Sequence, residues 1–192
     1  MKKQEQKVDK EEIGKKKNQG LNEEIEIEKI VLSIGAVGDE LDKATRLLNI
    51  ISKMKAVKTK SKKRIPAFDI RPGLEIGCKV TIRGKKGEKL LKILLEAINN
   101  RLKEKQITKN CFSFGIPEYI EIPEIEYQRD IGMMGLNVTV VFKRKGKRVL
   151  MKKKKRGRLP KKQHVEKEEI INFMKENFKI EIEGKHKPGE EE

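Results

Sequence analysis

The sequence contains few of the residues from which metal sites, disulfides and base-stacking surfaces are built. Its 192 residues include two cysteines, two histidines, two tyrosines, six phenylalanines and no tryptophan. Cys78 and Cys111 form no metal-ligand pattern with each other or with His164 and His186. We therefore expect no metal and no cofactor, and two small buried thiols in a reducing compartment.

Long apolar runs are also absent. None approaches the length of a membrane span or of a signal-peptide core, which predicts a soluble, intracellular protein without a membrane partner. The chain has no phosphate-binding loop that ends in Gly-Lys-Ser/Thr. Asp69 and Glu75 are isolated carboxylates, and His164 follows a pair of lysines. With no nucleophile, base or metal constellation, we expect no catalytic residue and no enzyme.

Positive charge is the dominant feature. The chain carries 47 basic and 30 acidic residues, a net charge of +17. In a basic segment at 143–162, thirteen of twenty residues are Lys or Arg, and in a second run at 53–64 the count is seven of twelve, with no acid in either. Such blocks stay extended until a polyanion neutralises them, and bound phosphates release counterions. Nucleic acid is the predicted partner, with a merely solvated surface as the alternative.

The scarcity of aromatic residues indicates which kind of nucleic acid the protein binds. Proteins that bind single strands stack successive bases on aromatic rings. Only eight of the 192 residues, six Phe and two Tyr, offer such a ring. A folded RNA, recognised through its phosphates and 2′-hydroxyl groups, therefore fits this composition better.

Apolar periodicity predicts five strands and three helices. The strands are expected at Ile25–Gly35, Val57–Lys60, 76–84, 112–116 and 136–142, and the helices at 39–54, 85–103 and from about 166 to 178. The apolar parity of the first strand changes near Glu28–Lys29, which indicates either a β-bulge or a switch in the environment of the strand. Asp39 is the expected N-cap of the first helix.

This order, β-α-β-β-α-β-β followed by a helix, predicts an α+β fold with an antiparallel sheet and helices packed on one face. Four regions are expected along the chain. They are a disordered N-terminal arm (1–22), an α+β domain (23–144), a basic extension with a short terminal helix (145–180) and a disordered acidic tail (181–192).

The other face of the predicted sheet is polar. Alternation with the apolar positions places cations and short hydrogen-bonding side chains on it: Lys29, Ser33, Lys79, Thr81, Arg83, Asn137 and Thr139. A face that only contacts solvent shows the same alternation. Periodicity alone therefore leaves RNA binding and plain solvation both open for this face.

Three stretches of the sequence resemble one protein family. KIVLSIGAVGDELDKATRLL, VKTKSKKRIPAFDIRPGLEIGCKVTIRG and FSFGIPEYIEIPEIEYQRDIGMMGLNVTVVFKRKGKRV are similar to the large-subunit ribosomal protein L-five family (universal uL-five, eukaryotic L-eleven). The similarity extends from about Glu24 to Phe178, and RGRLPKKQHVEKEEIINFMKENF resembles the archaeal-type form. The resemblance implies the L-five-like fold.

The resemblance also implies a function. Family membership implies a structural constituent of the cytoplasmic ribosome that binds 5S rRNA and large-subunit rRNA and attaches 5S rRNA in the central protuberance, beside neighbouring proteins. It further implies contact with peptidyl-site tRNA and a bridge to the small-subunit protein S-thirteen. The alternative is a free RNA-binding protein or RNA chaperone that acts outside the ribosome.

Site residues follow from the resemblance together with the charge pattern. The expected 5S rRNA contacts are Lys29, Ser33, Lys58, Lys60, Lys79, Thr81, Arg83, Asn137 and Thr139. The expected tRNA contacts, in a loop at 62–73, are Lys62, Lys63, Arg64, Phe68 and Arg71. The expected large-subunit rRNA contacts are Lys147, Arg148, Lys152, Lys153, Lys154, Lys155, Arg156, Arg158, Lys161 and Lys162. Phe68 either lies against the RNA or packs back on its own loop.

Two positions depart from the family pattern. Ser33 stands where members often carry Asn, and Met54 aligns with a family Gln. A serine offers one donor where asparagine offers two, and methionine cannot replace the hydrogen bonds of glutamine.

Overall fold

The computed structural model describes residues 24–123 and 125–183. Its centre is a six-stranded antiparallel sheet with the strand order β2-β3-β1-β7-β6-β5. The strands are β1 (Ile25–Gly35), β2 (Val57–Lys60), β3 (Glu75–Ile82), β5 (Ile107–Thr108), β6 (Cys111–Ile116) and β7 (Leu136–Arg144). The α+β class and the antiparallel sheet are confirmed.

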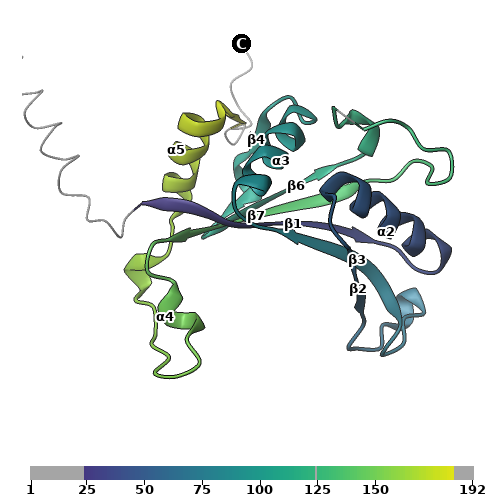
Figure 1. Cartoon of the computed structure of the whole chain (residues 1–192), viewed down its shortest axis with the longest axis horizontal. Helices are drawn as coiled ribbons and strands as arrows, with labels where there is room; N and C mark the ends of the chain where they lie inside the picture. The colour runs from purple at the N-terminus through teal and green to yellow at the C-terminus, as the bar shows by residue number, and fades with distance from the viewer. Residues whose placement is uncertain (1–23, 124, 184–192) are drawn as a thin grey trace, which may run out of the picture.

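Three helices lie on one side of this sheet (Figure 1). They are α2 (Asp39–Ser52), α3 (Lys85–Glu96) and α5 (Lys167–Phe178). The loop between β2 and β3 and the short helix α4 (Arg148–Met151) project on the opposite side, one at each end of the sheet (Figure 1). The sheet surface between these two projections, which no described helix covers, is called the free face below.

β1 sets the two faces because it pairs with β3 on one side and β7 on the other. Ile30, Leu32 and Ile34 point from it into the helix-covered core. The predicted bulge is confirmed, since the register with β7 shifts between Ile27 and Lys29. The extra residue restores the alternation that a strand with only one buried face needs.

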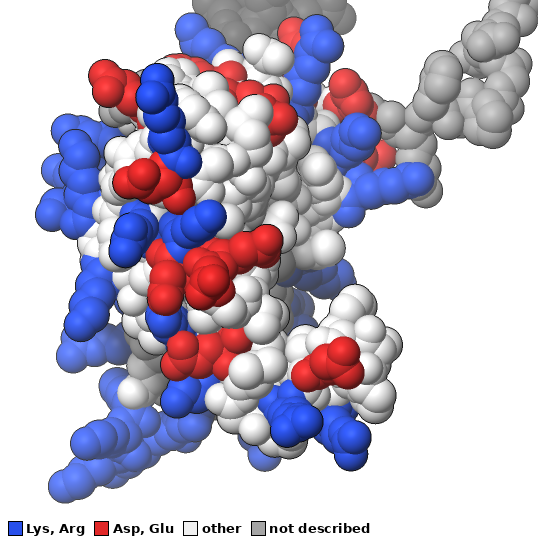
Figure 2. Space-filling view, turned by 90° about the vertical axis from the view of Figure 1, so that its right-hand side faces the viewer, with Lys and Arg blue, Asp and Glu red and all other residues white. Residues whose placement is uncertain are grey.

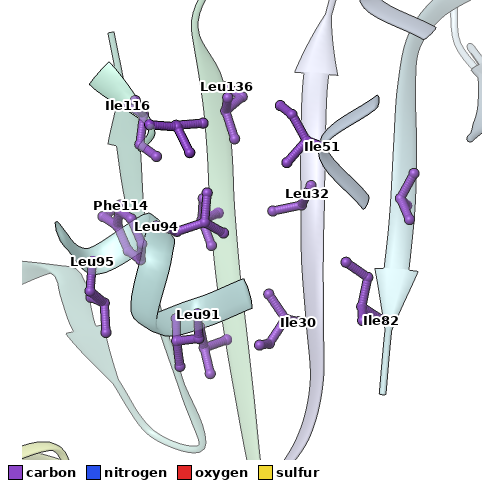
Figure 3. Packing of buried hydrophobic residues seen from close by; sticks show 14 of the residues in the cluster. Ile30, Leu32, Ile51, Ile82, Leu91, Leu94, Leu95, Phe114, Ile116 and Leu136 are labelled. Atoms are coloured by element: carbon purple, nitrogen blue, oxygen red, sulfur yellow. The ribbon is translucent and has the colours of Figure 1, made fainter. Parts of the chain in front are cut away.

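The core fills the space between the sheet and the helices. Leu91, Leu94 and Leu95 of α3 pack over residues of β1, β6 and β7 (Figure 3). Ile51 of α2 packs beside Leu32 in the same layer (Figure 3). Both helices carry their apolar residues at three- and four-residue spacing, so one stripe of each is buried.

Two helix ends differ from the predicted ones. Gly38, with φ of +65°, is the N-cap of α2, so Asp39 is the first helical residue and contributes charge rather than a capping bond. α3 ends at Glu96 instead of 103, because Asn99 and Asn100 adopt left-handed backbone angles that stop a helix. Leu102 is still buried, but it lies in a strand.

That strand, β4 (Arg101–Lys103), pairs in parallel with β8 (Glu181–Glu183). The 181–192 segment, predicted to be disordered, therefore begins with three residues of strand. The remaining residues of that segment, 184–192, and the predicted arm at 1–22 lie outside the described residues. Short 3₁₀ helices occur at Pro66–Phe68, Glu104–Gln106, Tyr119–Glu121 and Lys161–Gln163.

The C-terminal helix belongs to the same core as the sheet. Ile170 and Met174 of α5 are fully buried, and a capping box between Glu166 and Glu169 begins the helix. Five of the six phenylalanines form a chain of ring contacts that joins α5 to the sheet. The chain runs Phe114–Phe112–Phe142–Phe173–Phe178, with successive centroids 5.7–6.5 Å apart. Aromatic neighbours at these distances add to burial energy.

Asn110, in the turn between β5 and β6, ties the approach to α5 onto the sheet. Its backbone N–H donates to the carbonyl of Val165 (3.1 Å), and its side-chain oxygen accepts from the Val165 N–H (2.7 Å). The side-chain nitrogen lies 2.9 Å from Nδ1 of His164. Asn110 has φ of +64°, a conformation that asparagine tolerates better than most residues.

A membrane-spanning helix and a metal site are both absent from the described residues. Within residues 24–123 and 125–183, no helix is long and apolar enough to cross a membrane. The same residues contain no group of three or more His, Cys, Asp or Glu side chains arranged to hold a metal ion.

We predict that Asn110→Ala lowers the free energy of unfolding by about 1–3 kcal/mol, because it removes two side-chain hydrogen bonds and leaves the Val165 N–H unpaired. Thermal and urea unfolding, followed by circular dichroism, measure the change. Asn99→Ala is the matched control, since Asn99 also has positive φ but makes no side-chain hydrogen bond in the described structure. Equal losses in both variants would mean that only backbone strain matters at Asn110.

Candidate nucleic-acid interface

Strand register arranges the free face in rows. One row runs across four strands as Thr81, Val31, Thr139 and Ser113. The next row is Lys79, Ser33, Asn137 and Gly115. Directly opposed residues on neighbouring strands point to the same side of a sheet, so these side chains form one continuous surface.

The polar groups of these rows have no partner within the described part of the protein. The hydroxyls of Ser33, Thr81 and Thr139 and the amide of Asn137 make no hydrogen bond to any described residue. Neither row contains a carboxylate. The surface therefore offers donors, acceptors and the Lys79 charge without competing acids, which is what phosphate and ribose groups require.

Most of the predicted sheet-face residues are brought together. Lys29, Ser33, Lys79, Thr81, Asn137 and Thr139 lie on the free face, as alternation predicted. Arg83 follows the last paired residue of β3. It lines a hollow with the start of α3 and with Phe173. Arg83 is therefore at the margin of the surface and not within it.

Lys58 and Lys60 are placed differently. Val57 is opposite Lys79 on the free face, so Lys58, opposite the buried Cys78, points to the helix side. Its ammonium lies 2.7 Å from Asp42 of α2 and 3.4 Å from Glu75. The bond to Asp42 raises the pKa of Lys58, and Lys58 in turn lowers the pKa of Asp42.

Lys60 also approaches Glu75, at 3.9 Å. Two of the four lysines expected from sequence to contact 5S rRNA, Lys58 and Lys60, are therefore partly neutralised by the protein itself. A partner in a different element, such as Asp42 of α2 for Lys58 of β2, cannot be recognised from the spacing of residues within one strand.

Cys111 and Ser113 are residues of the free face that the sequence prediction missed. Cys111, expected to be buried like Cys78, lies opposite Val141 in the row of Lys29 and is only half-buried. Alternation with buried Phe112 was the signal that could have found it. Cys78 is buried as expected, and burial raises the pKa of its thiol.

The 62–73 loop is held in a defined shape. At its base the Ser61 N–H donates to the Leu74 carbonyl and the Gly73 N–H donates to the Ser61 carbonyl, both at 2.8 Å. Ile65 and Ile70 exchange two backbone hydrogen bonds around the tip. This reduces the conformational entropy lost when the loop binds a partner.

The side chains of this loop point outward. Phe68 at the tip is 74% exposed, so it does not pack back on its own loop. The four cations of the loop are exposed and form no ion pair with a described residue: Lys62, Lys63, Arg64 and Arg71. The loop thus presents cations and one aromatic ring on a supported hairpin.

Glutamates in and just before β1 neutralise the start of the basic segment. Lys143 pairs with Glu26 at 3.2 Å, Lys145 pairs with Glu24, and Lys147 pairs with Glu28. Arg144 pairs with Glu169 of α5. The first cations of the segment, including the predicted rRNA contact Lys147, are therefore used to fix it to the protein.

The remaining predicted rRNA contacts are exposed cations without an ion-pair partner in the described structure. They are Arg148, Lys152, Lys153, Lys154, Lys155, Arg156, Arg158, Lys161 and Lys162. The far end of the segment is fixed by the bonds of Asn110 to His164 and Val165. The cations without an ion-pair partner are thus concentrated in a loop, and both ends of this loop are bonded to the folded domain.

Figure 2 shows the charge distribution from the side on which α2 lies in Figure 1. Lys and Arg side chains follow one edge and the lower end of the molecule, whereas Asp and Glu gather in the middle of this view. The acidic first turn of α2 contains Asp39, Glu40 and Asp42. The acids of α2 thus lie on the helix side of the sheet, whereas Asp69 lies within the 62–73 loop and three glutamates, Glu24, Glu26 and Glu28, pair with the start of the basic segment.

Comparison with known proteins identifies the family. Residues 21–71 match the family described as Ribosomal protein L5, and residues 75–178 match the description of the C-terminus of that same ribosomal family. The large ribosomal subunit protein uL5 of Nanoarchaeum equitans is 44% identical over 161 residues, which cover 82% of this chain and 95% of that protein.

Two further archaeal proteins of the same name are similar. The protein of Methanosphaera stadtmanae is 40% identical, over 80% of this chain and 92% of its own length. That of Sulfolobus acidocaldarius is 37% identical, over 86% and 95% respectively. Family matches in both halves, and relatives aligned over nearly their whole length, confirm the resemblance seen in the sequence. The chain belongs to the uL5 family of large-subunit ribosomal proteins, which are structural and non-enzymatic components of the ribosome.

Proposed function

We propose that this protein attaches 5S rRNA to large-subunit rRNA in the central protuberance. In this proposal the free face binds 5S rRNA, and the exposed cations of the basic segment bind large-subunit rRNA. The 62–73 loop contacts peptidyl-site tRNA, and the protein bridges to the small-subunit protein S-thirteen beside other central-protuberance proteins.

One observation carries the proposal. The rows of the free face contain donors and acceptors without a described partner and no carboxylate, and a basic projection stands at each end of that face (Figure 1). A double-helical or folded RNA meets cations at its phosphates and hydroxyl or amide groups at its riboses in such an arrangement. The apolar side chains of this face include Val31, Val57 and Val141, and no aromatic ring stands in its described rows, so stacking of single-strand bases has little support there.

The alternative, an RNA chaperone that acts outside the ribosome, uses the same surface. Stoichiometry separates the two functions. A ribosomal constituent co-sediments one to one with large subunits after a salt wash, whereas a chaperone is washed off. The supported hairpin at 62–73 favours the ribosomal role, since a sequence-independent RNA binder needs no such projection.

For the free face, we predict that the double change Thr81→Ala and Thr139→Ala weakens 5S rRNA binding by about 1–3 kcal/mol, because each hydroxyl contributes roughly 0.5–1.5 kcal/mol. A filter-binding titration measures the affinity, and circular dichroism checks the fold. Thr45→Ala on α2 is the control, since Thr45 lies on the helix side of the sheet and its hydroxyl already donates to the Leu41 carbonyl. An affinity equal to that of the wild type would remove the free face from the 5S site.

Cys111 gives the same prediction a second readout. It is the more accessible of the two thiols, so alkylation of the native protein should label it before Cys78. Bound 5S rRNA should slow that labelling, whereas an equal concentration of unrelated duplex RNA should not.

For the basic segment, we predict that changing Lys152, Lys153, Lys154 and Lys155 to Gln flattens the salt dependence of binding to large-subunit rRNA. Each lost phosphate contact lowers the slope of log affinity against log salt by about 0.7–0.9. The control changes the same number of charges on the opposite side of the sheet, at Lys85, Lys86, Lys89 and Lys92 of α3. Equal slopes for the two variants would mean that only net charge matters.

For the loop, we predict that changing Lys62, Lys63, Arg64 and Arg71 to Ala leaves 5S rRNA binding and subunit assembly intact. The resulting ribosomes should hold peptidyl-site tRNA less tightly, and the deficit should shrink at high salt because the lost contacts are electrostatic. Retention of tRNA on purified ribosomes at two salt concentrations measures this. Failure to assemble would assign the loop to rRNA instead.

A further inference from the structure

An open hollow of about 800 Å³ lies at one end of the sheet, where β1 and β6 end and β7 begins. Ser33 and Asn137 of the free face line it, together with Gly35 and Gly115. Met133, Lys43 and Glu40 stand on its other walls. The hollow is therefore continuous with the surface proposed to bind 5S rRNA.

Glycines gather at this end of the sheet, but packing requires only some of them. A Cβ atom on Gly77 would lie 2.8 Å from the Ile34 carbonyl oxygen, and one on Gly135 would lie 2.6 Å from that of Pro117. A Cβ atom on Gly35 would meet no atom within 4 Å, and the φ of Gly35 is one that any residue adopts. The bare backbone at Gly35 serves neither the fold nor a turn.

Gly115 is similar. A Cβ atom there would contact only the side-chain oxygen of Asn137, at 3.3 Å. That side chain would have to give way, so glycine at 115 leaves the Asn137 amide free at the mouth of the hollow. A glycine inside a strand often marks a place where a ligand approaches the backbone closely.

The chemistry of the walls suits a nucleobase. The Asn137 amide offers two donors and an acceptor, and the Ser33 hydroxyl lies directly opposite it on the neighbouring strand. Neither group has a partner in the described structure. Met133, 61% exposed, supplies a polarisable apolar surface. A base that leaves its stack needs both apolar contact and hydrogen bonds to its edge.

From these observations we infer that the hollow takes the base of one unpaired nucleotide of the RNA on the free face, and that Asn137 reads the edge of that base. The inference rests on the proposed 5S rRNA binding and adds to it a determinant of specificity. A protein segment is the competing occupant. RNA is favoured because Ser33 and Asn137 belong both to the hollow and to the acid-free rows of the free face.

The test fills the hollow without disturbing the fold. Gly35→Leu has open space at its Cβ, so it should unfold at the wild-type temperature while its affinity for 5S rRNA falls about tenfold, the loss expected for one well-placed contact to a base. Glu96→Leu is the control, because it puts the same side chain on exposed α3, across the sheet. Its affinity should not fall.

Base-specific chemical probing identifies the nucleotide. Wild-type protein should protect the edge of one unpaired base of 5S rRNA, and Asn137→Ala should restore the reactivity of that base alone. Wild-type affinity and an unchanged probing pattern for both variants would overturn the inference and leave the proposed function standing. Loss of a protein from assembled subunits carrying Gly35→Leu, with 5S rRNA binding intact, would assign the hollow to a protein segment and also overturn it. If the wild-type protein itself does not bind 5S rRNA, both this inference and the proposed function are wrong.

Discussion

The position of β1 between β3 and β7 is the constraint on which the rest of the structure depends. A strand with a neighbour on both sides must divide its side chains strictly between two faces. Ile30, Leu32 and Ile34 thereby anchor the helix-covered core, and Lys29 and Ser33 lie among the polar residues of the free face. Ahead of these residues, Glu26 and Glu28 at the start of the strand, and Glu24 just before it, pair with lysines of the basic segment.

The positions of β1 and α2 also determine which cations are paired with an acidic residue. Acidic residues of β1 and α2 neutralise the cations closest to the sheet, such as Lys147 and Lys58. An exposed pair such as Lys58–Asp42 contributes little stability. The effect of these pairs is to determine which cations remain available to a polyanion. Cations without a described partner stand on the basic segment and the 62–73 loop, at opposite ends of the free face.

The sequence predicted much of this, and the failures have physical reasons. Alternation in β1, β3 and β7 is local information, so the core and six residues of the free face were found from it. The predicted end of α3 was wrong. The apolar spacing continues to Leu102, but Asn99 and Asn100 adopt left-handed backbone conformations, which a helix cannot include. The ion pair of Lys58 with Asp42 was missed because Asp42 comes from another element. The strand at 181–183 depends on pairing with β4, about eighty residues earlier, which no local pattern reports.

Attachment of the basic segment at both ends has a kinetic consequence. A charged tail leaves a bound strand by peeling from its free end, one phosphate at a time. Residues between Arg144, paired with Glu169, and Val165, bonded to Asn110, have no free end within the folded structure. If RNA binds these residues as proposed above, it must break several of their contacts together before it departs. Since affinity differences between related complexes reside mostly in dissociation rates, this closed loop favours long residence of the RNA over rapid exchange.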